Sequence, residues 1–391
     1  MTNDLNQYFY EIIHVFLYSI SNPPPMTIGI LKETQKGEKR VSISPKIAKA
    51  FIDKGFNVIV EEDAGKSSKY DNADYREVGA RVEKRGAVYK ECEVLIKINP
   101  FDEDGLKLVD DHHILICQLF HKSNPELVKE IAARGATVLS LDALPRITRA
   151  QDMDVLSSQN NLAGYKAVIK GAYEMTKIFP LMMTAAGTIT PSRVLIYGVG
   201  VAGLQAIATA KRLGAIVEAT DIRLETKEQT ESLGAKFITV ENEGEASEKG
   251  YAKAASEDYA RKQREAVNKS LFQADLVITT AMVPGRKSPI LITTEQVDQM
   301  KNGAVIIDLA AAQGGNCELS KMNKTVIRNG VKIIGTTIAP ESVATNASDL
   351  YAQNMFNFIS YLTEDNTFKW DLEDEITDET LIVYKGEIRK T

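Results

Sequence analysis

Short apolar runs and helical patterns alternate along the chain from residue 26 onward. The runs are rich in β-branched residues and have the length of strands, whereas the segments between them repeat apolar residues at intervals of three and four. This alternation is typical of βαβ units, whose strands form a parallel sheet. In the N-terminal half of the chain it predicts helices over 44–55 and 125–135, and strands over 26–31, 56–62, 93–98, 113–120 and 137–142.

A second series of the same kind follows after a polar stretch. It predicts a helix over 202–214 and strands over 193–198, 215–221, 235–240, 274–281, 303–310 and 331–337. A long amphipathic helix over 347–363 is expected to return to the first domain, and the chain then ends in a polar, turn-rich segment. The predicted fold class is therefore α/β, with two Rossmann-like, doubly wound parallel-sheet domains and a cleft between them. The predicted division is an extension over 1–25, a first α/β domain over 26–145 plus 340–391, and a second over 146–339.

Composition narrows the class of protein. The 391 residues are 44% hydrophobic and 26% charged, as in ordinary soluble globular proteins. A net charge of −6 without any basic run argues against nucleic acid or anionic lipid as the main partner. The three cysteines form no CxxC pair and the four histidines form no helical pair, so no metal site is predicted.

The segment 1–25 differs from the rest of the chain. Its apolar run from Tyr8 to Ile20 contains Glu11 and His14 and is shorter than the roughly 20 residues that span a bilayer. It has no Lys or Arg, which speaks against a targeting peptide, and Pro23–Pro25 close it like a linker. We interpret it as a docked or loosely ordered extension, with a partner-binding helix as the alternative. No other segment is long and apolar enough to predict a transmembrane helix.

The motif GVGVAG (Gly198–Gly203) follows a predicted strand and opens a predicted helix. In that context Gly198 permits a tight turn, Gly200 lets the backbone approach a pyrophosphate, and Gly203 lets helix and strand pack closely. The helix N-terminus would supply N–H groups and a positive dipole end to the phosphates. The sequence therefore predicts that residues 146–339 form a dinucleotide-binding Rossmann domain; a purely structural glycine turn is the alternative.

Asp221 lies at the end of the next predicted strand. Its carboxylate can accept hydrogen bonds from an unphosphorylated adenosine ribose and would repel a 2′-phosphate, which favours NAD(H) over NADP(H). Arg223 keeps NADP(H) open, because an arginine there could accept that phosphate. The later strand ends 279–285 and 308–316 are small and glycine-rich, suited to lie beside a ribose and nicotinamide, or else ordinary turns.

The stretch 145–165, PRITRAQDMDVLSSQNNLAGY, concentrates side chains that can hold an amide or a hydroxyl group. This stretch, together with 182–215 and 306–316, resembles the NAD(H)-binding component, or alpha subunit, of the proton-translocating NAD(P) transhydrogenases. The resemblance covers nearly all the chain from Met26 onward, and the broader family also includes alanine dehydrogenase. RAQDMDVLSSQ is the signature that separates the two branches.

The resemblance implies that the polar loop lies against the nicotinamide of NAD(H). Arg146, Gln151, Asp154 and Ser157 match the loop residues that set ring orientation and distance, and a loop-stabilising hydrogen-bond network is the alternative for each. The charge-rich segment 241–267 matches the family's mobile lid, or is a solvated helix; Ala255 stands where that lid often has methionine. The cofactor-binding residues so predicted are Gly198, Gly200, Val201, Ala202, Gly203, Asp221, Arg223, Gly250, Tyr251, Thr280 and Ala281.

The same comparison speaks against alanine dehydrogenase. Arg40 matches the arginine that binds the amino-acid carboxylate in that enzyme. The lysine position falls on Asn99, the histidine position on Phe120 (with His121 adjacent), and the aspartate position on Ala312. Arg40 is then interpreted as structural.

The resemblance implies a transhydrogenase component that exchanges hydride between its own NAD(H) and NADP(H) on a partner domain, coupled to proton movement. It also implies a homodimer and membrane-spanning partner subunits, with this chain peripheral on the cytoplasmic or matrix-like face of a membrane. A soluble alanine dehydrogenase-like enzyme and a non-catalytic NAD(H)-binding module are the alternatives.

Overall fold

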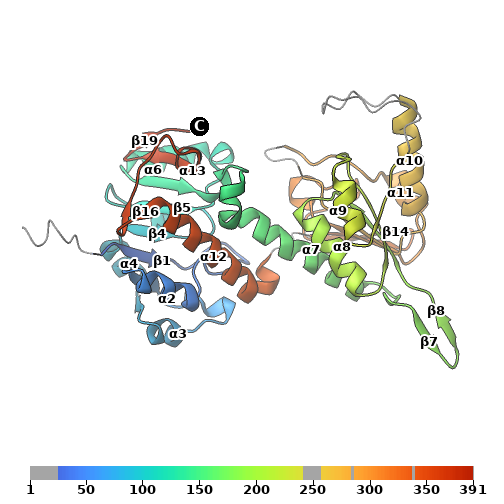
Figure 1. Ribbon diagram of the computed structural model, residues 1–391, viewed down its shortest axis with the longest axis horizontal. Coiled ribbons are helices and arrows are strands. Elements are labelled where there is room, and N and C mark those ends of the chain that lie inside the picture. The colour runs from blue at the N-terminus through green and yellow to red at the C-terminus, as the bar shows by residue number, and fades with distance from the viewer. Residues whose placement is uncertain (1–24, 241–256, 283–285, 337–339, 391) are drawn as a thin grey trace, which may run out of the picture. The chain divides into compact units, whose positions relative to one another are not determined.

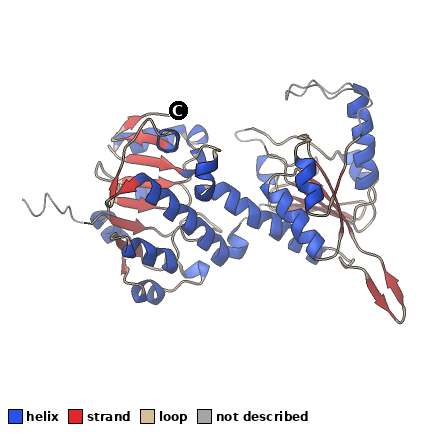
Figure 2. Cartoon of the chain, in the orientation of Figure 1, coloured by secondary structure: helices blue, strands red, loops and turns tan. Residues whose placement is uncertain are grey.

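The computed structural model describes residues 25–240, 257–282, 286–336 and 340–390. The chain divides into two compact units, unit 1 comprising Met1–Val155 with Ala344–Thr391 and unit 2 comprising Leu156–Val343. Figure 1 labels their elements, and Figure 2 shows that helices flank the sheet in each unit. The predicted extension over 1–25 lies, up to residue 24, outside the described residues. None of the described helices is long and apolar enough to cross a membrane.

Unit 1 is built on an eight-stranded sheet with the order β19-β18-β6-β5-β4-β1-β2-β3. The six strands from β6 to β3 are parallel, and β18 and β19 add antiparallel at one edge. The strands are β1 (Thr27–Ile30), β2 (Asn57–Glu61), β3 (Arg81–Glu83), β4 (Val94–Ile96), β5 (Ile114–Cys117), β6 (Thr137–Ser140), β18 (Leu381–Tyr384) and β19 (Glu387–Ile388). The helices are α2 (Pro45–Asp53), α3 (Asn72–Glu77), α4 (Arg85–Glu91), α5 (Glu103–Leu106), α6 (Pro125–Ala133), α12 (Ala344–Leu362) and α13 (Glu375–Thr380), and β16 (Thr363–Glu364) pairs with β17 (Thr367–Phe368).

Unit 2 is built on a seven-stranded sheet with the order β11-β10-β9-β12-β13-β15-β14. Its strands run parallel except β14, which is antiparallel at the edge. The strands are β9 (Arg193–Tyr197), β10 (Ile216–Thr220), β11 (Lys236–Phe237), β12 (Leu276–Thr279), β13 (Val305–Asp308), β14 (Lys324–Arg328) and β15 (Val331–Gly335). The helices are α7 (Val155–Glu174), α8 (Val201–Arg212), α9 (Thr226–Ser232), α10 (Glu257–Leu271) and α11 (Thr294–Asp298), and a hairpin pairs β7 (Met182–Thr184) with β8 (Gly187–Ile189).

Both sheets change direction of strand order at an inner pair. In unit 1 the order runs outward from β1 on one side and from β4 on the other; in unit 2 the corresponding pair is β9 and β12. Strands β4, β12 and β13 are buried along their whole length, as expected for parallel strands covered by helices on both faces. In open α/β sheets, ligands bind beyond the carboxyl ends of the strands at such a switch point.

Three features depart from the expected division and elements. The boundary predicted at 145/146 lies ten residues further along the chain, because Ala150 and Met153 are buried in unit 1. The C-terminal segment is not merely polar and turn-rich, since β18 is fully buried over 381–383 and pairs with β6. The hairpin β7–β8 was also not predicted. Both additions contain apolar runs too short to show a period, and strand pairing supplies what the pattern lacks.

The long amphipathic helix is where the sequence expected it. Helix α12 belongs to unit 1, so its predicted return to the first domain is confirmed. Residues repeated at helical intervals, among them Tyr351, Met355, Phe358 and Leu362, form its buried face.

Candidate functional site

The glycine turn after β9 has the conformation that the sequence predicted. Gly198 has a φ of +92°, which side-chain-bearing residues rarely adopt. A Cβ on Gly203 would lie 1.9 Å from the carbonyl oxygen of Gly198, so only glycine allows α8 to begin so close to β9. A Cβ on Gly200 would meet no atom within 4 Å, so the backbone there faces open space. These contacts leave room for a pyrophosphate against Gly200.

The N-terminus of α8 is free of competing acids. Its N-cap is Gly200, which has no side chain to accept from the first N–H groups, and no acidic residue lies in the first turn. The N–H groups of Val201, Ala202 and Gly203 therefore retain the positive helix end that favours an anion. Val201 is exposed, whereas Ala202 and Gly203 are buried.

Asp221 stands beside the same turn and forms an ion pair. Its carboxylate accepts from the N–H of Val199 at 2.7 Å and from the guanidinium of Arg223, with both distances 3.0 Å. Burial is the largest influence and raises the pKa of Asp221, but the bonds from Arg223 and Val199 together outweigh it and lower the pKa below its ordinary value. Asp221 is therefore an ionised acceptor at neutral pH, and the half-exposed Arg223 side chain is paired with it.

Thr280 and Ala281, at the end of β12, meet the glycine turn. The Thr280 hydroxyl donates to the Gly198 carbonyl oxygen at 2.9 Å. The Ala281 N–H donates to Asn316 Oδ1 at 3.0 Å, and Asn316 Nδ2 donates back to the Ala281 carbonyl at 2.8 Å. The structure thus brings the predicted residues Gly198, Thr280 and Ala281 together.

Two supporting residues of this edge were not predicted individually. Buried Asp308 accepts from the Thr279 hydroxyl at 2.9 Å and from the Asn316 N–H at 2.8 Å. It thereby ties the ends of β12 and β13 to the loop that carries Asn316. The signal in the sequence was an aspartate ending an otherwise apolar strand, which a buried core tolerates only when its oxygens are hydrogen-bonded.

The polar loop lies in unit 1 up to Val155 and forms the 3-10 helix η4 (Thr148–Met153). Arg146 and Gln151 are exposed, and Asp154 is half-buried. Ser157, also half-buried, lies in the first turn of α7 and belongs to unit 2. Gly250 and Tyr251, the predicted lid residues, lie outside the described residues; the described end of the charge-rich segment forms the start of α10.

Comparison with known proteins covers both units. The family model described as "Alanine dehydrogenase/PNT, N-terminal domain" matches residues 29–163, and its C-terminal counterpart matches 167–391. The chain belongs to the alanine dehydrogenase/PNT family. The resemblance inferred from the sequence is therefore confirmed.

Relatives place the chain in one branch of this family. The first of the separately encoded portions of the NAD(P) transhydrogenase subunit alpha of Rhodospirillum rubrum is 47% identical over 374 residues, which cover 93% of this chain and 97% of that protein. The crystal structure of a transhydrogenase from Sinorhizobium meliloti matches with a TM-score of 0.85 and 40% identity, covering 93% of this chain and 99% of that one. An L-alanine dehydrogenase structure shares the fold, with a TM-score of 0.77, 23% identity and coverage of 93% and 97%. The chain is an oxidoreductase of the transhydrogenase branch, and its predicted α/β class with two Rossmann-like sheets is confirmed.

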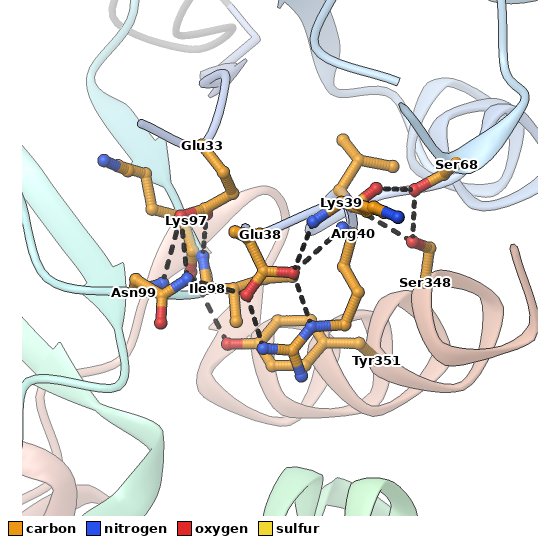
Figure 3. A network of polar contacts seen from close by, with 11 residues as sticks. Glu33, Glu38, Lys39, Arg40, Ser68, Lys97, Ile98, Asn99, Ser348 and Tyr351 are labelled. Carbon is orange, nitrogen blue, oxygen red and sulfur yellow. Dashed lines mark hydrogen bonds and ion pairs between the residues drawn. The ribbon is translucent and has the colours of Figure 1, made fainter. Parts of the chain in front are cut away.

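The position that binds the substrate carboxylate in alanine dehydrogenase is occupied here by an internal ion pair (Figure 3). Arg40 donates from Nε and Nη2 to the two oxygens of Glu38, at 2.8 and 2.6 Å, and both side chains are at least nine-tenths buried. Asn99 donates from Nδ2 to Glu38 at 2.9 Å and to Glu33 at 3.1 Å. These contacts support the structural interpretation of Arg40.

Two carboxylates of this network have opposite pKa shifts. Burial raises the pKa of Glu33 above its ordinary value, and neighbouring Lys97 only partly opposes it. Burial also raises the pKa of Glu38, but the bonds and charge of Arg40 outweigh it, so the pKa of Glu38 is lowered. The network is thus a self-contained set of paired charges within unit 1.

One histidine group in the described part of the chain places donor atoms together. Atoms of Asp110, His112 and His113 lie within 4.8 Å of one another. Buried His113 already accepts from the Asp110 N–H at Nδ1, at 3.0 Å, while its Nε2 lies 2.8 Å from the Tyr89 carbonyl oxygen. Both ring nitrogens are therefore used within the fold, and we interpret the group as structural.

Proposed function

We propose that this chain is the NAD(H)-binding catalytic component of a proton-translocating, Re/Si-specific NAD(P) transhydrogenase. Hydride would pass between NAD(H) bound here and NADP(H) bound by a partner domain. The observation that carries the proposal is the open backbone at Gly200 beside the ionised Asp221, in a chain that also has the RAQDMDVLSSQ loop. The names of its transhydrogenase relatives support the reaction type.

The residues of unit 2 would bind the dinucleotide. Gly198, Gly200 and Gly203, with the N–H groups of Val201 and Ala202, would hold the pyrophosphate. Asp221 would accept from the adenosine ribose hydroxyls, and Thr280 and Ala281 would border the nicotinamide half. Arg223 neutralises part of the Asp221 charge but already binds its two oxygens, which favours NAD(H) over a 2′-phosphorylated ligand.

The loop residues Arg146, Gln151, Asp154 and Ser157 would orient the nicotinamide. NAD(H) supplies the hydride when bound, and transfer between two nicotinamides needs no proton donor from the protein. Their contribution is therefore orientation and distance, on which transfer rates depend steeply. Gly250 and Tyr251 would belong to a lid that excludes water during transfer.

The proposed partners follow from the name "subunit alpha" that the relatives carry. They are NADP(H)-binding and membrane-spanning subunits or domains that couple transfer to proton transport, with this chain on the cytoplasmic or matrix-like face of the membrane. We also propose a homodimer. The hairpin β7–β8 extends from the body of unit 2 (Figure 1) and exposes Leu181, Met182, Met183 and Ile189, an apolar group that a second copy could cover.

The two alternatives make different predictions. An alanine dehydrogenase would consume NADH when given pyruvate and ammonia; the engagement of Arg40 by Glu38 and the presence of Asn99 argue against it. A non-catalytic module would bind NADH tightly and transfer hydride to no partner. Both alternatives are tested by the same experiment.

The test mixes the purified chain with an NADP(H)-binding transhydrogenase component and follows reduction of an NAD analogue by NADPH. Gln151→Asn keeps the amide but withdraws it by one methylene, so transfer should slow by about tenfold or more while NADH still binds. Gln299→Asn, an exposed glutamine at the C-terminal end of α11, is the matched control. Absence of transfer by the wild type, despite NADH binding, would overturn the proposed function in favour of the binding module.

A further inference from the structure

The main chain of the polar loop is held by amide side chains from a distant segment of the sequence. Asn354 Nδ2 donates to the carbonyl oxygen of Asp152 at 2.6 Å, and Asn357 Nδ2 donates to the same oxygen at 3.1 Å. A carbonyl oxygen has two lone pairs, so these two donors can occupy both. Asp152 lies between Gln151 and Asp154, so the bonds act on the peptide that carries those side chains.

The two asparagines are costly choices for the helix that carries them. They lie three residues apart on the inner part of α12, where they share one face. Asparagine has low helix propensity in such positions and, when buried as Asn354 is, must be hydrogen-bonded. Gln353 Nε2 donates to Asn357 Oδ1 at 2.9 Å, which orients the Asn357 amide with its nitrogen toward Asp152.

A second anchor holds the same loop one turn further along α12. Arg149 Nη1 donates to the Tyr361 hydroxyl at 3.2 Å, and Arg149 Nη2 lies 3.0 Å from Asp374 Oδ1. Tyr361 in turn donates to Asp374 Oδ1 at 2.8 Å, while Asp374 caps α13 by accepting from the Thr377 N–H at 2.9 Å. The loop is thus bound from both sides of η4, and the buried side chains of Ala150 and Met153 close it from beneath.

We propose that Asn354, Asn357 and Tyr361 are positioning residues for hydride transfer, acting through the main chain of η4 on Gln151 and Asp154. The inference rests on the proposed function. Fixing the peptide at Asp152 removes freedom from the two flanking residues, which the exposed Gln151 cannot obtain from packing of its own. None of the three acts on the cofactor directly, so their loss should change the transfer rate and not the affinity for NADH.

The experiment compares Asn354→Leu, Asn357→Leu and their double variant with the wild type, in complex with an NADP(H)-binding component. Leucine matches asparagine in size and favours the helix, so α12 should be retained. We expect the double variant to transfer hydride about 10- to 100-fold more slowly, with the Kd for NADH within about twofold of wild type. Asn346→Leu, an exposed asparagine in the first turn of α12, should leave both values unchanged.

Tyr361→Phe tests the second anchor, with Tyr384→Phe on β18 as its control. Amide hydrogen exchange over residues 148–154 provides a readout that needs no hydride transfer; exchange should be faster in the asparagine variants and in Tyr361→Phe, and unchanged in the controls. An unaltered transfer rate in the double variant would overturn the positioning role, as would equal losses of rate and of NADH affinity. If the wild type transfers no hydride, the proposed function fails; unchanged exchange in the variants would then overturn the clamp itself.

Discussion

The two units place opposite kinds of chemistry at the same topological position. In unit 1 the switch between β1 and β4 is followed by buried charged side chains, Glu33, Glu38 and Arg40, which satisfy one another. In unit 2 the switch between β9 and β12 is followed by glycines, and the space beside Gly200 is empty of protein atoms. Sheets with the same central strand order therefore do not imply equal capacity to bind.

The difference lies in which groups are left for a ligand. At the unit 1 edge, the fork of Arg40 is bound by Glu38 and the amide of Asn99 by two carboxylates. At the unit 2 edge, the helix end is left without a side-chain acceptor and Asp221 is held ionised. Function is carried by the site and not by the fold, and substitutions at the two edges should separate stability from binding.

The largest effect is expected at the closed edge. Glu38→Ala would deprive buried Arg40 of its carboxylate, and breaking a buried pair from one side costs about 3–5 kcal/mol of the free energy of unfolding. NADH affinity should stay the same. Urea denaturation measures the first quantity and fluorescence titration with NADH the second. Glu83→Ala, which breaks the exposed pair with Arg81, should cost less than about 1 kcal/mol; equal losses in the two variants would refute the contrast.

A pair of glycine substitutions tests the open edge. Gly203→Ala places a Cβ against the Gly198 carbonyl, which should cost about 1–3 kcal/mol of stability and abolish NADH binding. Gly200→Ala meets no protein atom, and its φ of −87° suits alanine, so stability should change by less than about 0.5 kcal/mol. Its affinity for NADH should nevertheless fall about tenfold or more, a loss of about 1.4 kcal/mol in binding. Calorimetric titration that found full affinity in Gly200→Ala would argue against a pyrophosphate at that backbone.

The smallest effect is a pH dependence at Asp221. Its pKa is lowered in the folded protein, so its contribution to stability is present above the unfolded pKa of about 3.9 and is lost as pH falls through the lower folded value. Asp221→Asn should therefore unfold at a lower temperature than wild type at pH 7, and the gap should close toward about pH 3. Thermal unfolding followed over that range measures it. A gap that is constant with pH would show that the Asp221 charge does not stabilise the fold.

Much of each unit was accessible from the sequence, for identifiable reasons. Strands such as β4 and β12 are continuous apolar runs, and α2 begins with Pro45 at its first position and is followed by Gly55 at a φ of +94°. The glycine turn could be located because its three glycines answer local requirements of backbone geometry. The amino-acid pattern also indicated the family, from the loop around Gln151.

Other features depend on partners that are remote in sequence. Strand β18 has only a short apolar run, and becomes a strand because it pairs with β6. The boundary between the units shifted because η4 packs in unit 1 through Ala150 and Met153. Asn354 and Asn357 interrupted an amphipathic helix, a visible anomaly whose reason was the Asp152 carbonyl some two hundred residues earlier.

The sequence alone thus determined the alternation of strands and helices, the glycine turn and the acid that follows it, because periodicity and backbone conformation are local properties. Only the tertiary structure decided which charges are already paired, as Arg40 is with Glu38, and which backbone faces open space, as at Gly200. Those outcomes depend on burial and on contacts between separate segments, and the chain acquires them only when it folds.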